Sequence, residues 1–185
     1  EYAQSQVVGP TLGQDALVSG VVVAPIGLAV VMLYLLFFYH GLGLLTAAAM
    51  AVFAVLYLGI LAALSAFHLF SLSLAGIAGI VLTIGMAVDA NVLIYERIRE
   101  ELHLGLSPLA AVKAGFERAT ISITDSNLTT IIATVILYQF GTGPIRGFAV
   151  TLSLGIVASM FTAIFVSRAI FEYWARKCGP KGISI

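Results

Sequence analysis

Five long apolar runs constrain the fold of this chain more than any other feature of its sequence. They cover roughly residues 17–39, 44–66, 71–95, 121–140 and 147–171, each about 20 to 25 residues long. A helix of about 20 apolar residues is long enough to cross the hydrocarbon layer of a bilayer. Hydrophobic residues make up 61% of the 185 and charged residues only 10%, which is outside the composition of soluble domains. The sequence therefore predicts an all-α polytopic membrane protein, a bundle of five transmembrane helices.

Much of the charge lies between the third and fourth runs, in residues 96–120. The segment breaks at Leu104–Pro108, where Ser107 and Pro108 suit the N-cap and first turn of a new helix. Beyond the break, apolar side chains recur at helical spacing between charged ones, at Leu109, Val112 and Phe116. We expect residues 96–120 to form a cytoplasmic, interfacial helical elbow along the membrane surface.

The uneven distribution of basic residues sets the predicted orientation. Arg146 lies on one side of the spans, and the other eight Lys and Arg residues lie opposite, at Arg97, Arg99, Lys113, Arg118, Arg168, Arg176, Lys177 and Lys181. Because cytoplasmic segments carry the excess of Lys and Arg, we predict an extracytoplasmic N-terminus and a cytoplasmic C-terminus in a bacterial or archaeal cytoplasmic membrane. Residues 1–16 then form an extracytoplasmic entry segment, 17–171 the transmembrane domain and 172–185 a cytoplasmic tail. The entry segment has no signal-peptide pattern, so we expect the chain to be the C-terminal portion of a longer protein.

The composition argues against several kinds of site. Nine basic and nine acidic residues give zero net charge, so no nucleic-acid surface is expected. The three histidines lack metal-ligand spacing, and the single cysteine, Cys178, has no internal disulfide partner. We therefore predict no catalytic residue, no metal site and no cofactor beyond a coupling ion, with membrane lipids among the partners.

Two carboxylates are notable because they lie within the apolar runs. Asp89 falls inside Gly76–Tyr95, seven residues before Glu96 and thus roughly 10 Å inside it at a helical rise of ~1.5 Å. Asp125 lies seven residues after Arg118, in the next run. A charge at the bilayer centre costs from ~2.5 to more than ~10 kcal/mol, and protonation or a partner relieves it. Since the two spans are antiparallel, we expect both carboxylates at similar depth, facing each other or sharing a hydrated cavity.

Polar side chains accompany both carboxylates in a similar local pattern, DANV at 89–92 and DSNL at 125–128. Asp125 and Thr129 share one helical face, while Asn127 and Thr130 fall on an adjacent one. A helix this polar must face protein or water. We expect a supporting polar network of Asn91, Asn127, Thr129 and Thr130; interhelical hydrogen bonding alone is the alternative.

Small residues mark the expected helix-packing surfaces. Gly155 and Ser159 belong to a stripe that recurs every four residues along the fifth run, and Gly85 lies one turn before Asp89. Small residues let neighbouring helices approach closely. We expect Gly155 and Ser159 to pack against another helix, and Gly85 to admit a neighbouring group beside Asp89.

One stretch, GIAGIVLTIGMAVDANVLIYERIREEL at residues 76–102, resembles the signature membrane segment of the SecD family. Residues 8–17 and 114–152 resemble the same family, so the resemblance covers nearly the whole chain. It implies a member of the resistance-nodulation-division superfamily with six spans and a large periplasmic domain between the first and second. This chain resembles spans two to six.

The resemblance also implies a function. Members of the SecD family pair with a SecF-like subunit beside the Sec translocation channel, and proton flow moves the periplasmic domain that pulls the exported polypeptide outward. The carboxylate that matches Asp89 is implicated in that proton flow. The implied function is use of the proton motive force to assist protein export, with no enzymatic step.

We therefore predict a proton relay at Asp89 and Asp125, although sodium suits the same oxygen-rich surroundings. Two other functions stay open. One is a proton-coupled exporter of small molecules or lipids from the same superfamily, which would need a matching second half. The other is a passive membrane scaffold for the translocase, in which Asp89 is a structural hydrogen-bonding residue.

Overall fold

The computed structural model describes residues 10–39, 41–67 and 73–178, all in helices, turns or short connections. The elements in chain order are α1 (Pro10–Tyr39), α2 (Gly41–Ala66), α3 (Leu74–His103), α4 (Pro108–Phe140), α5 (Gly143–Phe161), a π-helical segment η1 (Thr162–Ser167) and α6 (Arg168–Cys178). Within these ranges the fold is all-α, as the sequence predicts.

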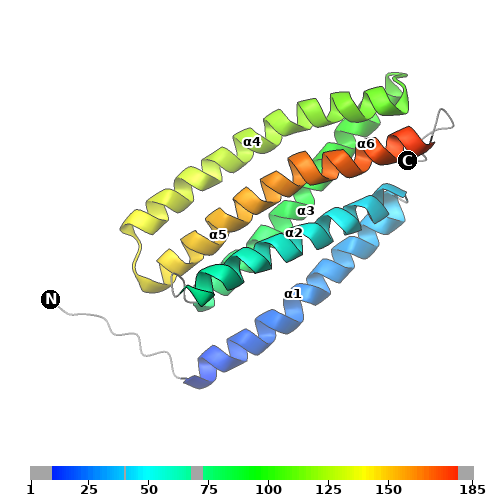
Figure 1. Cartoon of the computed structure of the whole chain (residues 1–185). Coiled ribbons are helices and arrows are strands. Elements are labelled where there is room, and N and C mark those ends of the chain that lie inside the picture. The colour runs from blue at the N-terminus through cyan, green and yellow to red at the C-terminus, as the bar shows by residue number, and fades with distance from the viewer. Residues whose placement is uncertain (1–9, 40, 68–72, 179–185) are drawn as a thin grey trace.

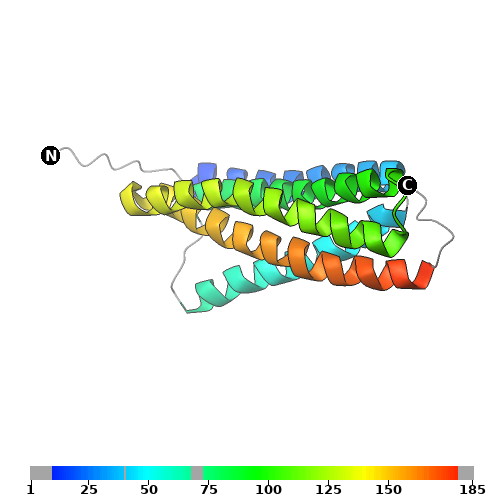
Figure 2. The same cartoon turned by 90° about the horizontal axis from the view of Figure 1, so that it is seen from above.

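The helices form an elongated bundle in which α3 is the central element. It packs against α1, α2, α4, α5 and η1. Figure 1 shows α1 and α4 at opposite edges of the bundle, with α5 and α2 between them on one side of α3. The elements α5, η1 and α6 follow one another as a single long rod, which Figure 2 shows from above.

Among the described residues, four helices are long and apolar enough to cross a membrane. They are Gly43–Ala66, Leu74–His103, Pro108–Phe140 and Gly143–Lys177. A shorter apolar stretch, Pro25–Tyr39, lies within α1. Length and composition thus support four spans, and the fifth, at 17–39, stays a prediction.

The ends of the helices differ from the predicted bounds for local reasons. At α3, the Ser73 hydroxyl caps the first turn by accepting a hydrogen bond from the Gly76 N–H at 3.0 Å. The α1 helix begins at Pro10, a residue type whose fixed φ favours the first turn, so residues 10–16 of the predicted entry segment are helical. At the other end, residues 172–178 of the predicted tail belong to α6. Residues 1–9 and 179–185 lie outside the described part of the chain.

The predicted elbow, residues 96–120, is not a separate surface element. Helices α3 and α4 continue through it to His103 and from Pro108, so it is an antiparallel hairpin made of their ends. A Cβ on Gly115 would lie 2.8 Å from the Ile98 backbone nitrogen, so the two backbones are close. Buried Glu101 also pairs with Arg118 at 2.9 Å. The apolar spacing that predicted a surface helix serves instead to pack α4 against α3.

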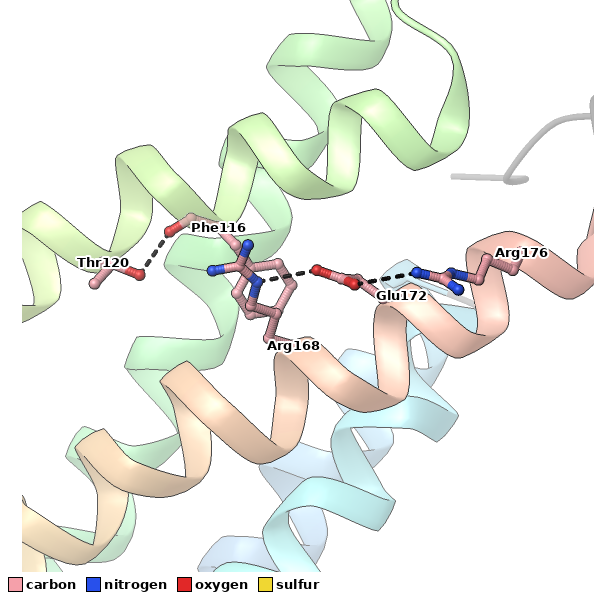
Figure 3. A network of polar contacts seen from close by, with 5 residues as sticks. All are labelled: Phe116, Thr120, Arg168, Glu172 and Arg176. Atoms are coloured by element: carbon pink, nitrogen blue, oxygen red, sulfur yellow. Dashed lines mark hydrogen bonds and ion pairs between the residues drawn. The ribbon is translucent and has the colours of Figure 1, made fainter.

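The hairpin and α6 lie at one end of the bundle and carry most of the described basic residues. Several of these are paired with acids of the same helix. Figure 3 shows Glu172 of α6 between Arg168, 3.0 Å away, and Arg176, 4.0 Å away, beside the part of α4 that holds Phe116 and Thr120. Tyr95 stacks on Phe171 with ring centroids 5.4 Å apart, which joins α3 to α6. This end is therefore both charged and well packed.

Candidate functional site

Asp89 lies near the middle of α3, on the face that α2 and α5 leave free. The opposite face of α3 carries Gly79, Thr83 and Asn91, all buried against α5, η1 or α2. The Asp89 side chain is exposed, and within the described part of the chain its carboxylate has neither a hydrogen bond nor an ion pair. A carboxylate in an apolar helix is thus left open to water, to a proton or to a partner.

Two hollows flank α3 and meet at this carboxylate. The first measures about 330 Å³ and lies between α1 and α3, with walls that include Leu28, Val31, Ile84 and Val88. These walls are apolar, so Asp89 is the ionisable group in the described lining. Gly85 also lines this hollow, and a Cβ built there would meet nothing within 4 Å. Within the described residues, Gly85 therefore borders open space beside Asp89, and the neighbouring group expected there is not in contact with it.

The second hollow lies between α3 and α4 and also measures about 330 Å³. Met86 and Leu93 line it from α3, and Ser126 and Asn127 line it from α4. Asp89 is the described residue that this hollow shares with the first. Polar groups of α4 therefore share a space with Asp89, while the side toward α1 is apolar.

The two asparagines of the predicted network lie in different places. Asn127 is buried and lines the second hollow with Asp89, and its amide donates to the Ile123 carbonyl at 2.8 Å. Asn91 is buried on the opposite face of α3, where its amide donates to the Ala87 carbonyl at 2.9 Å. Two residues advance a helix by about 200°, so Asn91 points away from Asp89.

Asn91 joins α3 to the π-helical segment. The hydroxyl of Ser167, the last residue of η1, donates to Asn91 Oδ1 at 3.0 Å, and both side chains are buried. The Asn91 amide also lies 3.9 Å from the Met50 sulfur of α2. The π-helix is rare, appears mostly as single turns inside α-helices and is frequent at functional sites. Here the turn places Ser167 against Asn91.

Asp125 lies on the outward side of α4. It is exposed and belongs to the lining of neither hollow beside Asp89. The hydroxyls of Thr129 and Thr130 donate to carbonyls of their own helix, those of Asp125 and Ser126, each at 3.4 Å. The structure thus brings Asn127 and Ser126 to Asp89, and it leaves Asp125 and Thr129 on another surface.

The small residues of the fifth run lie where α5 and η1 meet the rest of the bundle. Gly155 is buried against α3, and a Cβ there would lie 2.2 Å from the Thr83 methyl carbon. Gly79 is the reciprocal case, since its Cβ would lie 2.2 Å from the Thr151 hydroxyl. Ser159 is buried and donates to the Ile156 carbonyl of its own helix at 2.9 Å.

Sequence reasoning missed the polar contributions of Ser126 and Ser167. Ser126 follows Asp125 directly and lies about 100° around the helix, toward α3. Its place on the face of α4 that meets α3 could therefore have been predicted from the helical spacing. Ser167 was visible only as part of the small-residue stripe, because its partner depends on the register of η1. Within the described residues, no three His, Cys, Asp or Glu side chains gather closely enough to hold a metal ion.

Residues 1–177 match the family described as "Protein export membrane protein SecD/SecF, C-terminal". The chain belongs to this SecD/SecF C-terminal family. The protein translocase subunit SecD of Syntrophobacter fumaroxidans is 55% identical over 182 residues, which are 98% of this chain and 33% of that protein. SecD of Desulfurispirillum indicum is 53% identical over 172 residues, 93% of this chain and 33% of that protein. The chain thus spans about a third of the length of these relatives.

Solved structures share both the fold and the sequence of this SecD/SecF domain. The crystal structure of SecDF from Thermus thermophilus, a translocon-associated membrane protein, has a TM-score of 0.86 and 44% identity, covering 91% of this chain and 23% of that one. A crystal structure of SecDF in a super-membrane-facing form has a TM-score of 0.84 and 42% identity, covering 94% and 23%. The chain is therefore the C-terminal membrane portion of a SecD-type, multi-pass membrane protein.

Proposed function

We propose that this chain is the membrane portion of a SecD-type subunit that uses the proton motive force to assist protein export. In this proposal Asp89 binds and releases the proton. The observation that carries it is the exposed, unpaired Asp89 carboxylate in the middle of α3, where two hollows of about 330 Å³ meet. The similarity to a translocon-associated SecDF supports the assignment to export.

The energetic argument begins with the location of Asp89. A charged side chain at the centre of a bilayer costs from ~2.5 to more than ~10 kcal/mol, so such residues are rare and mostly functional. Within the described residues Asp89 has no cation to offset that cost. It must therefore take up a proton, meet a partner from outside this chain or be hydrated, and a change among these states is a change of charge inside the membrane.

The hollows supply the space for hydration. A volume near 330 Å³ is far above the ~10–15 Å³ that one water requires. Ser126 and Asn127 give the hollow toward α4 polar partners, while the hollow toward α1 is lined by apolar groups. We propose that water reaches Asp89 along α4, and that the α1 side is the barrier that prevents a continuous water path.

The driving force per proton is modest but sufficient. One elementary charge crossing ~100 mV releases about 2.3 kcal/mol. A few protons therefore match the few kcal/mol that separate two packings of the same helices. Beyond the protonation of Asp89, no covalent bond of the protein or of the exported polypeptide is made or broken, so this is transport and not enzymatic catalysis.

Several finer proposals accompany this one. Asp125 is a second proton-binding group, with Thr129 and Thr130 beside it. It takes part in the proton relay only if a surface of a partner subunit or a conformational change connects it to Asp89. All five runs span the membrane, with the N-terminus extracytoplasmic and the C-terminus cytoplasmic. A SecF-like subunit, the Sec channel and the exported polypeptide are the partners, the last through a periplasmic domain outside this chain.

The decisive experiment replaces Asp89 in the full-length protein, assembled with its SecF-like partner and channel in membrane vesicles. We expect Asp89→Asn to lower gradient-dependent export to the level measured without a proton gradient. Asp89→Glu keeps an ionisable group and should retain part of the activity. Unchanged proton-dependent export in Asp89→Asn, with the complex intact, would reject the proposal and favour the passive scaffold.

The same vesicles separate the remaining alternatives. Asp125→Asn lowers proton-dependent export if Asp125 belongs to the relay and leaves it unchanged if Asp89 acts alone. Replacing sodium by potassium leaves export unchanged for proton coupling and abolishes it for sodium coupling. Transport of small molecules or lipids in place of a secretory polypeptide would favour the exporter.

A further inference from the structure

A third hollow lies between α2, α4 and α5, away from Asp89. It measures about 290 Å³ and is almost entirely apolar, with walls formed by Val135 and Tyr138 of α4, Val150 and Leu154 of α5, and Leu64 of α2. Three of its lining residues carry a hydroxyl group, Thr134, Tyr138 and Ser153. Those of Ser153 and Thr134 need no ligand, since Ser153 donates to Thr134 at 2.8 Å. The hollow is therefore suited to a flexible apolar chain.

Arg146 lies at the end of this hollow and carries an unneutralised charge. Its guanidinium carbon is 5.9 Å from the centroid of the Tyr138 ring, which itself lines the hollow. The Nε group donates to the Gly141 carbonyl at 2.9 Å. Within the described residues Arg146 has no ion pair, and the sequence has no acidic residue from 126 to 171. The two terminal amino groups of Arg146 are thus available to an anion.

The spacing along α5 connects the cation to the hollow. Val150 and Leu154 follow Arg146 by four and eight residues, which corresponds to roughly 6 and 12 Å along the helix. A ligand with an anionic head and an apolar chain would thus reach the guanidinium and the hollow together. We propose that Arg146 and this hollow bind one anionic phospholipid, with its phosphate on Arg146 and an acyl chain along Val150 and Leu154.

The chemistry favours a phospholipid over a free phosphate. Guanidinium groups pair with phosphate through charge-assisted hydrogen bonds that fit two oxygens, and the positive N-terminal end of α5 adds a smaller attraction. Tyrosine is typical of the membrane interface, where its ring lies between head groups and chains. A free phosphate would use only the Arg146 end and would leave the apolar hollow unused.

The test counts lipids bound to the full-length protein in its complex, by native mass spectrometry in detergent. The probes are phosphatidylglycerol and phosphatidylethanolamine with the same acyl chains. We expect the intact protein to retain phosphatidylglycerol preferentially. Arg146→Gln should lower that preference by roughly two- to fivefold, the range for one exposed charge pair. The matched control is Arg176→Gln, which replaces an exposed arginine at the other end of the bundle that is paired with Glu172. This variant should change the preference for phosphatidylglycerol little.

A second variant tests the hollow separately from the charge. Val150→Phe fills the space beside Tyr138 and should reduce retention of both lipids, whereas Val157→Phe, at an exposed position of the same helix, should not. Equal retention of the two lipids by the intact protein would overturn the proposal. Indistinguishable effects of Arg146→Gln and Arg176→Gln on lipid retention would also overturn it. Loss of phosphatidylglycerol retention on addition of inorganic phosphate alone would do the same, since it would identify a phosphate site without a lipid chain.

Discussion

At the scale of single residues, the environment of Asn91 determines what its loss would cost. The side-chain oxygen of Asn91, Oδ1, accepts a hydrogen bond from the Ser167 hydroxyl at 3.0 Å, and both side chains are buried. We expect Ser167→Ala to lower the free energy of unfolding by about 1–3 kcal/mol, since it leaves a buried acceptor without its partner. Ser159→Ala is the matched control, because the buried Ser159 hydroxyl bonds only to a carbonyl of its own helix.

Thermal unfolding of the full-length protein in detergent, followed by circular dichroism, measures both variants. The Ser167 variant should unfold at a clearly lower temperature than the Ser159 variant. Equal losses would mean that the Asn91 contact adds nothing beyond the local hydroxyl, and that η1 does not depend on it.

Residue identities predicted which side chains are unusual but only partly which of them meet. Asp89 was identifiable because an acid inside an apolar run needs relief from the cost of burial. Asn91 was grouped with it by sequence proximity, although a helical separation of about 200° places the two on opposite faces. The contact between Asn91 and Ser167 was not predictable, because it depends on a π-helical turn that the apolar pattern of the fifth run does not reveal.

At the scale of helices, the interface between α3 and α5 depends on glycines that face threonines. Gly155 meets Thr83 and Gly79 meets Thr151, so each helix supplies both a small and a larger residue. Such pairs bring backbones together where lipid provides no hydrophobic driving force between helices. Asp89 lies on the far side of α3, so this interface holds α3 in place while its other face stays open.

Adding one methyl group to this interface should therefore be costly. The Cβ of Gly155→Ala would lie 2.2 Å from the Thr83 methyl carbon, so one of the helices must shift. We expect a loss of about 1–3 kcal/mol in the free energy of unfolding, the range for overpacking a filled core. The control is Gly59→Ala on α2, where a Cβ would meet nothing within 4 Å. Urea or thermal unfolding of both variants checks the difference, and equal stabilities would contradict the packing argument.

Helix positions were predictable from the apolar pattern, whereas the form of the elbow was not. Apolar spacing at Val112 and Phe116 fits a helix lying on a membrane and equally fits one packed on a neighbour, because both bury one face. Packing on α3 is favoured by Gly115, which brings α4 close to Ile98, and by the ion pair of Glu101 with Arg118. Long-range contacts of this kind leave no periodic signal in the sequence.

At the scale of the whole molecule, the outer faces of the bundle indicate how it is covered. Helices α1 and α4 lie at its edges and expose large apolar side chains such as Phe37 and Phe140, 79% and 82% exposed. Lipid or other parts of a SecD/SecF assembly would cover such faces, since large apolar patches exposed to water favour association. The chain is thus adapted to an apolar environment around its length and to water at its ends.

The orientation of the bundle yields the last prediction. The described basic residues other than Arg146 lie at the end formed by the α3–α4 hairpin and α6, and this asymmetry predicts that the hairpin is cytoplasmic. Single cysteines at two exposed positions test it, Glu117→Cys in the hairpin and Thr142→Cys at the opposite end, in the full-length protein without other cysteines. A membrane-impermeant maleimide added to intact cells should label Thr142→Cys, and should label Glu117→Cys only after the membrane is opened. The reverse pattern would invert the topology, and with it the direction in which a proton reaches Asp89.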